Sequence, residues 1–98
     1  MTINKEKNGG ELKLALEGRL DTLTAPQLDE AIKADAEDAE TILLDMSGLE
    51  YVSSAGLRVI LSAHKVMSRK GGLRLTNVNE TVMEVFQLTG FADLLDIE

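Results

Sequence analysis

Apolar residues at every second position mark the first strands of the chain. Residues 11–17 alternate in this way, which predicts a strand whose buried face carries Leu12, Leu14 and Leu16. Residues 2–7 can form an edge strand before it, because the intervening Asn8-Gly9-Gly10 is a strong hairpin signal. The chain is therefore expected to begin with a β-hairpin.

Three further segments have the character of short strands. Residues 41–45 form an apolar run between polar residues, which predicts a buried strand, and residues 45–48 are expected to form its turn. Residues 73–77 predict another short strand. The tail 91–98 can give one more at its end.

The segment after residue 24 has the pattern of an amphipathic helix. Thr24 with Gln27 three residues later is a capping-box pattern, and Pro26 suits the first turn of a helix. One face is apolar and consists of Leu28, Ala31, Ile32 and Ala36. The remaining face is expected to be solvated and carries Asp29, Glu30, Lys33, Asp35, Glu37 and Asp38. This helix therefore packs on one side only.

Two more helices follow. From Leu57 onward apolar residues recur at helical spacing, which predicts a helix over about 54–70 that Gly71-Gly72 ends. Asn79 is the expected N-cap of a third helix and Gly90 its stop. Its inward residues are expected to be Val82, Val85 and Phe86.

The order of these elements predicts the fold class. Two strands, a helix, and then strands alternating with helices indicate an α/β protein. We expect a mixed sheet of four to five strands with three amphipathic helices packed against it. At 98 residues the chain is expected to form a single domain over residues 1–98, with one core.

Charge and cysteine content exclude several functions. Ten Lys and Arg against 17 Asp and Glu give a net charge of -7, which argues against nucleic acid or an anionic membrane as partner. The acidity serves either solubility or a match to a basic partner. The absence of cysteine excludes disulfides, thiol catalysis and thiolate metal sites. Without a membrane-length apolar run or a signal-peptide segment, we expect a cytoplasmic protein.

The most informative segment is the start of the second helix. If Ser53 is the N-cap, Ser54 occupies the first helical position, beside unpaired backbone N–H groups and the positive end of the helix dipole. A phosphoryl group would be stabilised there. Both serines can also be plain caps, and spacing alone favours that interpretation, because serine is among the best N-cap residues.

Catalysis, metal binding and cofactor binding find no support in the sequence. The only histidine, His64, lies ten positions beyond Ser54 on one helix, about 15 Å along its axis, so it cannot be the base of a serine hydrolase. Residues 52–56 also lack the glycine that precedes the serine of a nucleophile elbow. One His and scattered carboxylates make no metal ligand set, and no phosphate-cradling glycine loop is present. We expect no catalytic residue, no metal and no cofactor, with His64 as a structural residue.

Four segments together resemble a known family. Residues 18–25 (GRLDTLTA), 42–61 (ILLDMSGLEYVSSAGLRVIL), 71–75 (GGLRL) and 85–91 (VFQLTGF) look like the STAS domain of bacterial anti-sigma factor antagonists. The match keeps the order of the family and runs over nearly the whole chain. In that family the strand-to-helix loop is approximately D-S-[ST]-G-L, and its first serine is phosphorylated by the anti-sigma factor. Carried over, the phosphoserine of the family falls on Ser54.

The resemblance implies a partner switch in transcription regulation. The unphosphorylated protein would bind an anti-sigma factor that is a serine kinase and so free a sigma factor. Phosphorylation at Ser54 would switch it off, and a PP2C-type phosphatase would reset it. Asp21 matches an Asp of the family and would lie near Ser54, where its charge adds to the repulsion, although it can also be a plain turn residue. The implied partner surface comprises Asp21, Thr22, Ser53, Ser54, Ala55, Gly56, Leu57 and Arg58, with Gly56 allowing a partner to approach closely.

Departures from the family pattern leave an alternative open. Ser53 stands where the family has Asp, although the two residues cap helices about equally well. The chain ends at Glu98, where relatives often carry a further C-terminal helix. The alternative is a constitutive adaptor or scaffold in a regulatory or sensory assembly, which uses the same surface without phosphorylation. We expect a monomer that binds neither nucleic acid nor membrane.

Overall fold

Five strands and three helices surround one largely aliphatic core in the computed structural model, which describes residues 1–98. The elements are, in chain order, β1 (Thr2–Asn8), β2 (Glu11–Leu20), α1 (Ala25–Asp35), β3 (Thr41–Val52), α2 (Ser54–Met67), β4 (Leu73–Thr76), α3 (Glu80–Thr89), a 3-10 turn (Phe91–Asp93) and β5 (Asp96–Ile97). This order confirms the predicted α/β fold with a mixed sheet and three helices.

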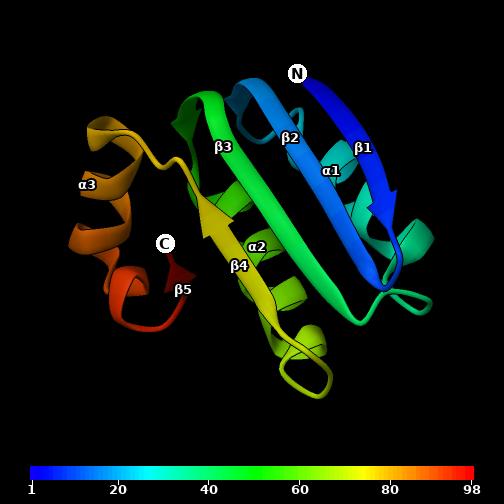
Figure 1. Cartoon of the computed structure of the whole chain (residues 1–98). Helices are drawn as coiled ribbons and strands as arrows, with labels where there is room; N and C mark the ends of the chain where they lie inside the picture. The colour runs from blue at the N-terminus through cyan, green and yellow to red at the C-terminus, as the bar shows by residue number, and fades with distance from the viewer.

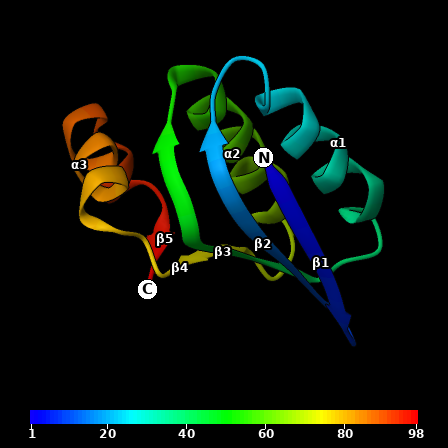
Figure 2. The ribbon, with the colours of Figure 1, turned by 90° about the horizontal axis from the view of Figure 1, so that it is seen from above.

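The sheet has the strand order β1-β2-β3-β4-β5. β1 and β2 form the antiparallel hairpin, whereas each of the other neighbouring pairs is parallel. Helices α1 and α2 cover one face of the sheet, and the opposite face turns toward the viewer in Figure 1. Helix α3 lies on the side of β4 and β5, away from α1 (Figure 2). Since β2 and β3 run parallel, their carboxyl ends meet at one edge of the sheet.

Alternation along the two central strands builds the core. The sequence predicts this alternation for residues 11–17, whereas for residues 41–45 it predicts a continuous apolar run in a buried strand. The helix-covered face of the sheet consists of Leu12, Leu14 and Leu16 from β2 and Ile42, Leu44 and Met46 from β3. Helix α1 adds Leu28 and Ile32 to the core, and α2 adds Ile60 and Met67. Burial of each such side chain contributes about 1.5–3 kcal/mol to folding. This core fixes α1 and α2 relative to the sheet.

The turn predicted over 45–48 is wrong, because β3 continues through it for 12 residues in all. Residues 45–48 span three steps of β3 that face only two steps of β2, at residues 15–17. The extra residue is a β-bulge, where the Asp45 carboxylate accepts a hydrogen bond from the Ser47 N–H at 3.0 Å. Residues typical of turns therefore mark an irregularity inside a strand, and β3 extends onward to the start of α2.

The capping box predicted at the start of α1 is also wrong. Thr24 is the N-cap residue, but its side chain makes no capping hydrogen bond. Its hydroxyl accepts from the Asp21 N–H and donates to the Arg19 carbonyl, both at 2.8 Å. The Gln27 side chain turns away and donates to the Met1 carbonyl at 3.1 Å. Asp21 closes the turn instead, because its Oδ1 accepts two backbone N–H groups of the turn.

The caps predicted for the last helix are confirmed. Asn79 is the N-cap of α3, with its Oδ1 accepting from the Val82 N–H at 2.9 Å. Gly90 ends this helix with φ of 82°, a left-handed conformation that suits glycine.

None of the three helices is long and apolar enough to cross a membrane.

Asp35 departs from the solvated face predicted for α1. Its side chain is only 11% exposed and forms ion pairs with Lys5 and Lys7 of β1, the second at 2.6 Å. Both lysines point to the helix-covered face, because they pair in register with Leu14 and Leu12. Three charged residues thus tie the edge strand β1 to α1.

We predict that Asp35→Asn lowers stability in a pH-dependent way. Hydrogen bonds from Lys5 and Lys7, together with their charges, hold the pKa of Asp35 below its usual value in the folded state. Its ionised form therefore stabilises the fold above the unfolded-state pKa of about 4, and this contribution is lost as the pH falls through the folded-state pKa. Urea denaturation should show a difference in unfolding free energy between wild type and Asp35→Asn that is constant near neutral pH and shrinks below about pH 4.

The control for this experiment is Glu30→Gln, which alters an exposed carboxylate of the same helix that makes no ion pair. This variant should unfold like the wild type at neutral pH. A deficit of Asp35→Asn that stays unchanged down to pH 2 would contradict the role given to the two lysines.

Candidate functional site

The carboxyl ends of β2 and β3 are joined where the candidate site begins. Leu20 and Val52 pair in register, and the Ser53 N–H donates to the Leu20 carbonyl at 2.8 Å. From these two strand ends the loop into α1 and the first turn of α2 leave the sheet next to each other (Figure 2). The structure thus brings the Asp21 loop and the Ser53-Ser54 pair to the same edge of the sheet.

The two serines differ in what their hydroxyl groups do. Ser53 is the N-cap of α2, as the sequence predicts, with Oγ accepting from the Gly56 N–H at 3.3 Å. Its carbonyl accepts the first helical hydrogen bond, from the Leu57 N–H at 2.9 Å. Ser54 is the first residue of α2, is exposed, and makes no side-chain hydrogen bond within the protein. The hydroxyl of Ser54 is therefore the one available to another molecule.

Gly56 and Leu57 face inward. A Cβ on Gly56 would lie 2.5 Å from Cγ and 2.8 Å from Cδ2 of Leu20, a side chain that is fully buried. The sequence suggests Gly56 as a point of close approach for a partner, whereas the approach seen in the structure is to Leu20 of the same chain. Leu57 is 4% exposed and belongs to the core. These two residues position the site from beneath.

The outer surface of the site is formed by the other predicted residues and one more. Thr22, Ser54 and Arg58 are exposed, while Asp21, Ser53 and Ala55 are half-buried. Leu23, which the sequence analysis did not single out, is 88% exposed in the same loop as Asp21. The available signal was a leucine in a polar loop, outside any strand or helix period. An exposed apolar side chain therefore stands beside the polar groups of the site.

A second feature missed from the sequence lies next to this edge. Arg19 and Tyr51, which pair in register near the ends of β2 and β3, stack with the guanidinium carbon 4.4 Å from the ring centroid. Such cation–π pairs contribute about 0.5–1 kcal/mol at exposed positions. The stack engages Arg19 and adds an aromatic surface to the neighbourhood of the site.

The site carries few charged groups, namely Asp21, Arg58 and the positive end of the α2 dipole. Backbone N–H groups of Thr24 and Leu23 donate to Asp21 and hold the pKa of its carboxyl below the usual value, so Asp21 is ionised at neutral pH. Arg58 is exposed and makes no ion pair. The first turn of α2 carries no acidic residue, so the positive end of its dipole is not balanced by a side chain.

This arrangement offers a hydroxyl group without a catalytic base. Ser54 and His64 lie on one continuous helix, ten residues apart, which keeps the imidazole about 15 Å further along the axis. His64 is half-buried, and its Nδ1 is enclosed without a hydrogen-bond partner. No group of three or more His, Asp or Glu side chains is placed to hold a metal ion. What the site offers is an exposed serine hydroxyl at the start of a helix, with no histidine beside it.

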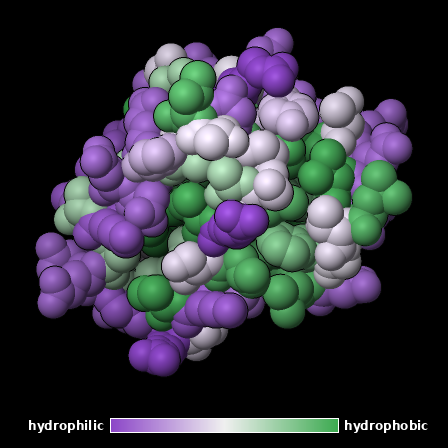
Figure 3. Space-filling view, turned by 180° about the vertical axis from the view of Figure 1, so that it is seen from behind, coloured by the Kyte–Doolittle hydropathy of each residue, from purple (hydrophilic) through white to green (hydrophobic).

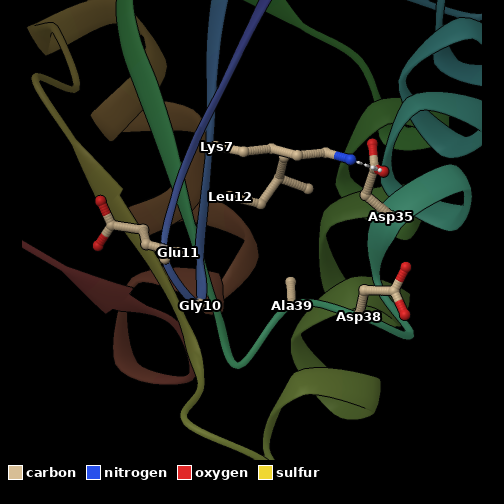
Figure 4. A pocket seen from close by; sticks show the side chains of 8 residues that line it. Lys7, Gly10, Glu11, Leu12, Asp35, Asp38 and Ala39 are labelled. Carbon is tan, nitrogen blue, oxygen red and sulfur yellow. Dashed lines mark ion pairs between the residues drawn. The ribbon is translucent and has the colours of Figure 1, made fainter.

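Two hollows on the surface lie away from this site. The hollow in Figure 4 lies near the hairpin and the end of α1, and across it Lys7 reaches the Asp35 carboxylate. Of the charged groups that line it, Lys7 and Asp35 belong to the tie between β1 and α1, whereas Glu11 pairs with Arg74 of β4. The other is a shallow groove between α1 and α2, on the side of the molecule shown in Figure 3, where apolar side chains gather near the middle of the view. Its apolar lining consists of Ile32, Ala36, Ala63, Val66 and Met67.

We predict that Gly56→Ala destabilises the protein although alanine favours helices. Helix propensity alone would add up to about 1 kcal/mol of stability, whereas forcing a methyl group into a filled core costs about 1–3 kcal/mol. Because the methyl group would overlap Leu20, we expect a net loss of up to about 2 kcal/mol in unfolding free energy measured in urea. Ser62→Ala, at an exposed position of α2, is the matched control and should be neutral or slightly stabilising. A Gly56→Ala protein more stable than wild type would refute the packing argument.

Comparison with known proteins finds the family that the sequence segments resemble. The family model of the STAS domain matches residues 2–98. The anti-sigma-B factor antagonist of Bacillus subtilis (strain 168) is 28% identical over 98 residues, which cover 99% of this chain and 90% of that protein. The anti-sigma F factor antagonist of Paenibacillus polymyxa is 32% identical over 102 residues, which cover 99% of this chain and 86% of that protein.

Solved structures agree in fold. The anti-sigma factor antagonist SpoIIAA in its unphosphorylated form matches with a TM-score of 0.84 at 22% identity, over 99% of this chain and 88% of that one. The Bacillus cell fate determinant SpoIIAA in the phosphorylated form matches with a TM-score of 0.76 at 21% identity, over 99% and 91% of the two chains. These matches confirm the resemblance that the four sequence segments indicate. The chain belongs to the STAS domain family.

Proposed function

We propose that this chain is an anti-sigma factor antagonist that a serine kinase switches off by phosphorylating Ser54. Its relatives carry the name of anti-sigma factor antagonists, and the fold is known in a phosphorylated and an unphosphorylated form of SpoIIAA. The observation that carries the proposal is the exposed and unbonded hydroxyl of Ser54 at the first position of α2. The protein acts in the cytoplasm by binding, with no chemistry of its own.

In the unphosphorylated state the site is a small surface of mixed character. Leu23 gives it an exposed apolar side chain, and Thr22, Ser54 and Arg58 give it polar groups without internal partners. Protein interfaces of this kind combine an apolar anchor that becomes buried with a polar rim that fixes orientation. The partner is an anti-sigma factor, and its capture releases the sigma factor.

Phosphorylation changes this surface without opposing the fold. The phosphate adds about -1.5 to -2 charges at neutral pH. At the start of α2 it meets unpaired backbone N–H groups and the positive end of the helix dipole, with no acidic residue already there. A partner, in contrast, would have to accept the new charge and bulk next to the ionised Asp21. The penalty therefore falls on binding, and a PP2C-type phosphatase restores the binding form.

Intact and peptide mass spectrometry after incubation with a kinase-type anti-sigma factor of the same genome and Mg-ATP tests the proposal. We expect one added phosphate on the wild type and on Ser53→Asn, and none on Ser54→Ala. Asparagine caps helices as well as serine, so Ser53→Asn removes the neighbouring hydroxyl while keeping the cap. Ser54→Ala places an excellent helix former at this exposed position, so the variant is expected to fold.

The other outcomes of this experiment are equally informative. A phosphate retained on Ser54→Ala would contradict the assignment of the acceptor. Absence of phosphate with partner binding intact would favour the constitutive adaptor, in which Ser53, standing in place of the family's Asp, serves only as a cap.

A further inference from the structure

Arg58 lies one helical turn beyond Ser54 on the exposed side of α2. Residues four apart in a helix are neighbours on its surface, with about 5–6 Å between their Cβ atoms. Both residues are exposed, and α2 is continuous between them. A phosphate on the Ser54 oxygen would therefore come within reach of the long and flexible Arg58 side chain.

Arg58 has no competing partner in the protein. Arg19 is stacked on an aromatic ring and Arg74 is held by two carboxylates, whereas Arg58 makes neither an ion pair nor a side-chain hydrogen bond. Helix α2, Ser54–Met67, contains no acidic residue, so its own helix offers Arg58 no carboxylate. On the neighbouring loop, Oδ1 of Asp21 accepts hydrogen bonds from its own turn, and the Asp21 carboxylate forms no ion pair with Arg58. The guanidinium is thus free until a new anion arrives.

We infer that Arg58 is the intramolecular partner of the phosphate on Ser54, so that phosphorylation withdraws Arg58 from the partner surface as well as adding charge. An anion placed N-terminal to a cation at this spacing has the favourable orientation relative to the helix dipole. The planar guanidinium can bind two phosphate oxygens at once, which an ammonium group does less well. The inference rests on the proposed function only for the presence of the phosphate on Ser54.

The pairing makes phosphorylation remove an attractive group from the partner surface in addition to bringing in negative charge. Before phosphorylation the exposed end of α2 offers a partner one free positive group, suited to a carboxylate of the anti-sigma factor. Afterwards the guanidinium is engaged, and the remaining charge of the pair is negative. One contact that attracts the partner is lost at the same time as a repulsive one appears.

The test is a phosphorus NMR titration of protein in which phosphoserine is incorporated at position 54 during translation. The wild type is compared with Arg58→Gln, and with Arg69→Gln as a control on an exposed arginine just beyond the other end of the same helix. Because a paired guanidinium stabilises the dianion, the second pKa of the phosphate should be about 0.3 pH unit lower in the wild type than in Arg58→Gln. Arg69→Gln should match the wild type, and Arg58→Lys should fall between. Equal pKa values in wild type and Arg58→Gln would overturn the inference.

This design separates the inference from the proposed function. Translational incorporation requires no kinase, so the NMR result stands whether or not a kinase modifies Ser54. Failure of the proposed function would appear as no phosphate transferred to Ser54 by the kinase. Failure of the inference would appear as unchanged phosphate pKa values while Ser54 is still phosphorylated by the kinase.

Discussion

The contact between Leu20 and the first turn of α2 is the constraint on which the site depends. The carbonyl of Leu20 accepts the Ser53 N–H at 2.8 Å, and its side chain fills the space that a Cβ of Gly56 would need. These interactions join the end of β2 to the start of α2 across the parallel strand pair. Because Leu20 is completely buried, neither side can shift without opening the core.

This constraint separates the parts of the site that position from the parts that bind. The Ser53 hydroxyl caps α2, and Gly56 packs against Leu20. Both residues therefore interact within the protein, which leaves Ser54 at a fixed place with its hydroxyl free. The loop that carries Asp21 is fixed by its own hydrogen bonds on the neighbouring strand end. Under the proposed function, a phosphate on Ser54 would change the charge of a surface whose backbone is held by core packing, and its effect would fall on a partner rather than on the fold.

Sequence patterns predicted those features that depend on local periodicity and caps. The alternation of Leu12, Leu14 and Leu16 was sufficient for a one-sided strand, and Ser53 and Asn79 were sufficient for two helix starts. The bulge in β3 could not be distinguished from a turn by sequence, because small and polar residues such as Asp45, Ser47 and Gly48 favour both. The parallel partner strand, which decides between them, lies far away in sequence.

The sequence also could not predict which charged residue is buried or which group a glycine contacts. Asp35 is placed like a solvated residue in the pattern of α1, and only its pairing with Lys5 and Lys7 of the edge strand makes its burial favourable. A glycine in a motif signals a close approach without saying to what, and here Gly56 approaches Leu20. Leu23 was missed because a single exposed leucine in a loop has no periodic neighbours.

In the proposed switch, a phosphate on Ser54 decides whether the partner binds. Isothermal titration calorimetry can measure this effect. A kinase-type anti-sigma factor of the same genome, with ADP, is titrated against unmodified protein and against protein carrying phosphoserine at position 54. We expect tight binding of the unmodified protein and of Ser54→Ala, and a binding of the phosphorylated protein that is at least roughly tenfold weaker, equivalent to about 1.4 kcal/mol. Equal affinity of the modified and unmodified forms would contradict it.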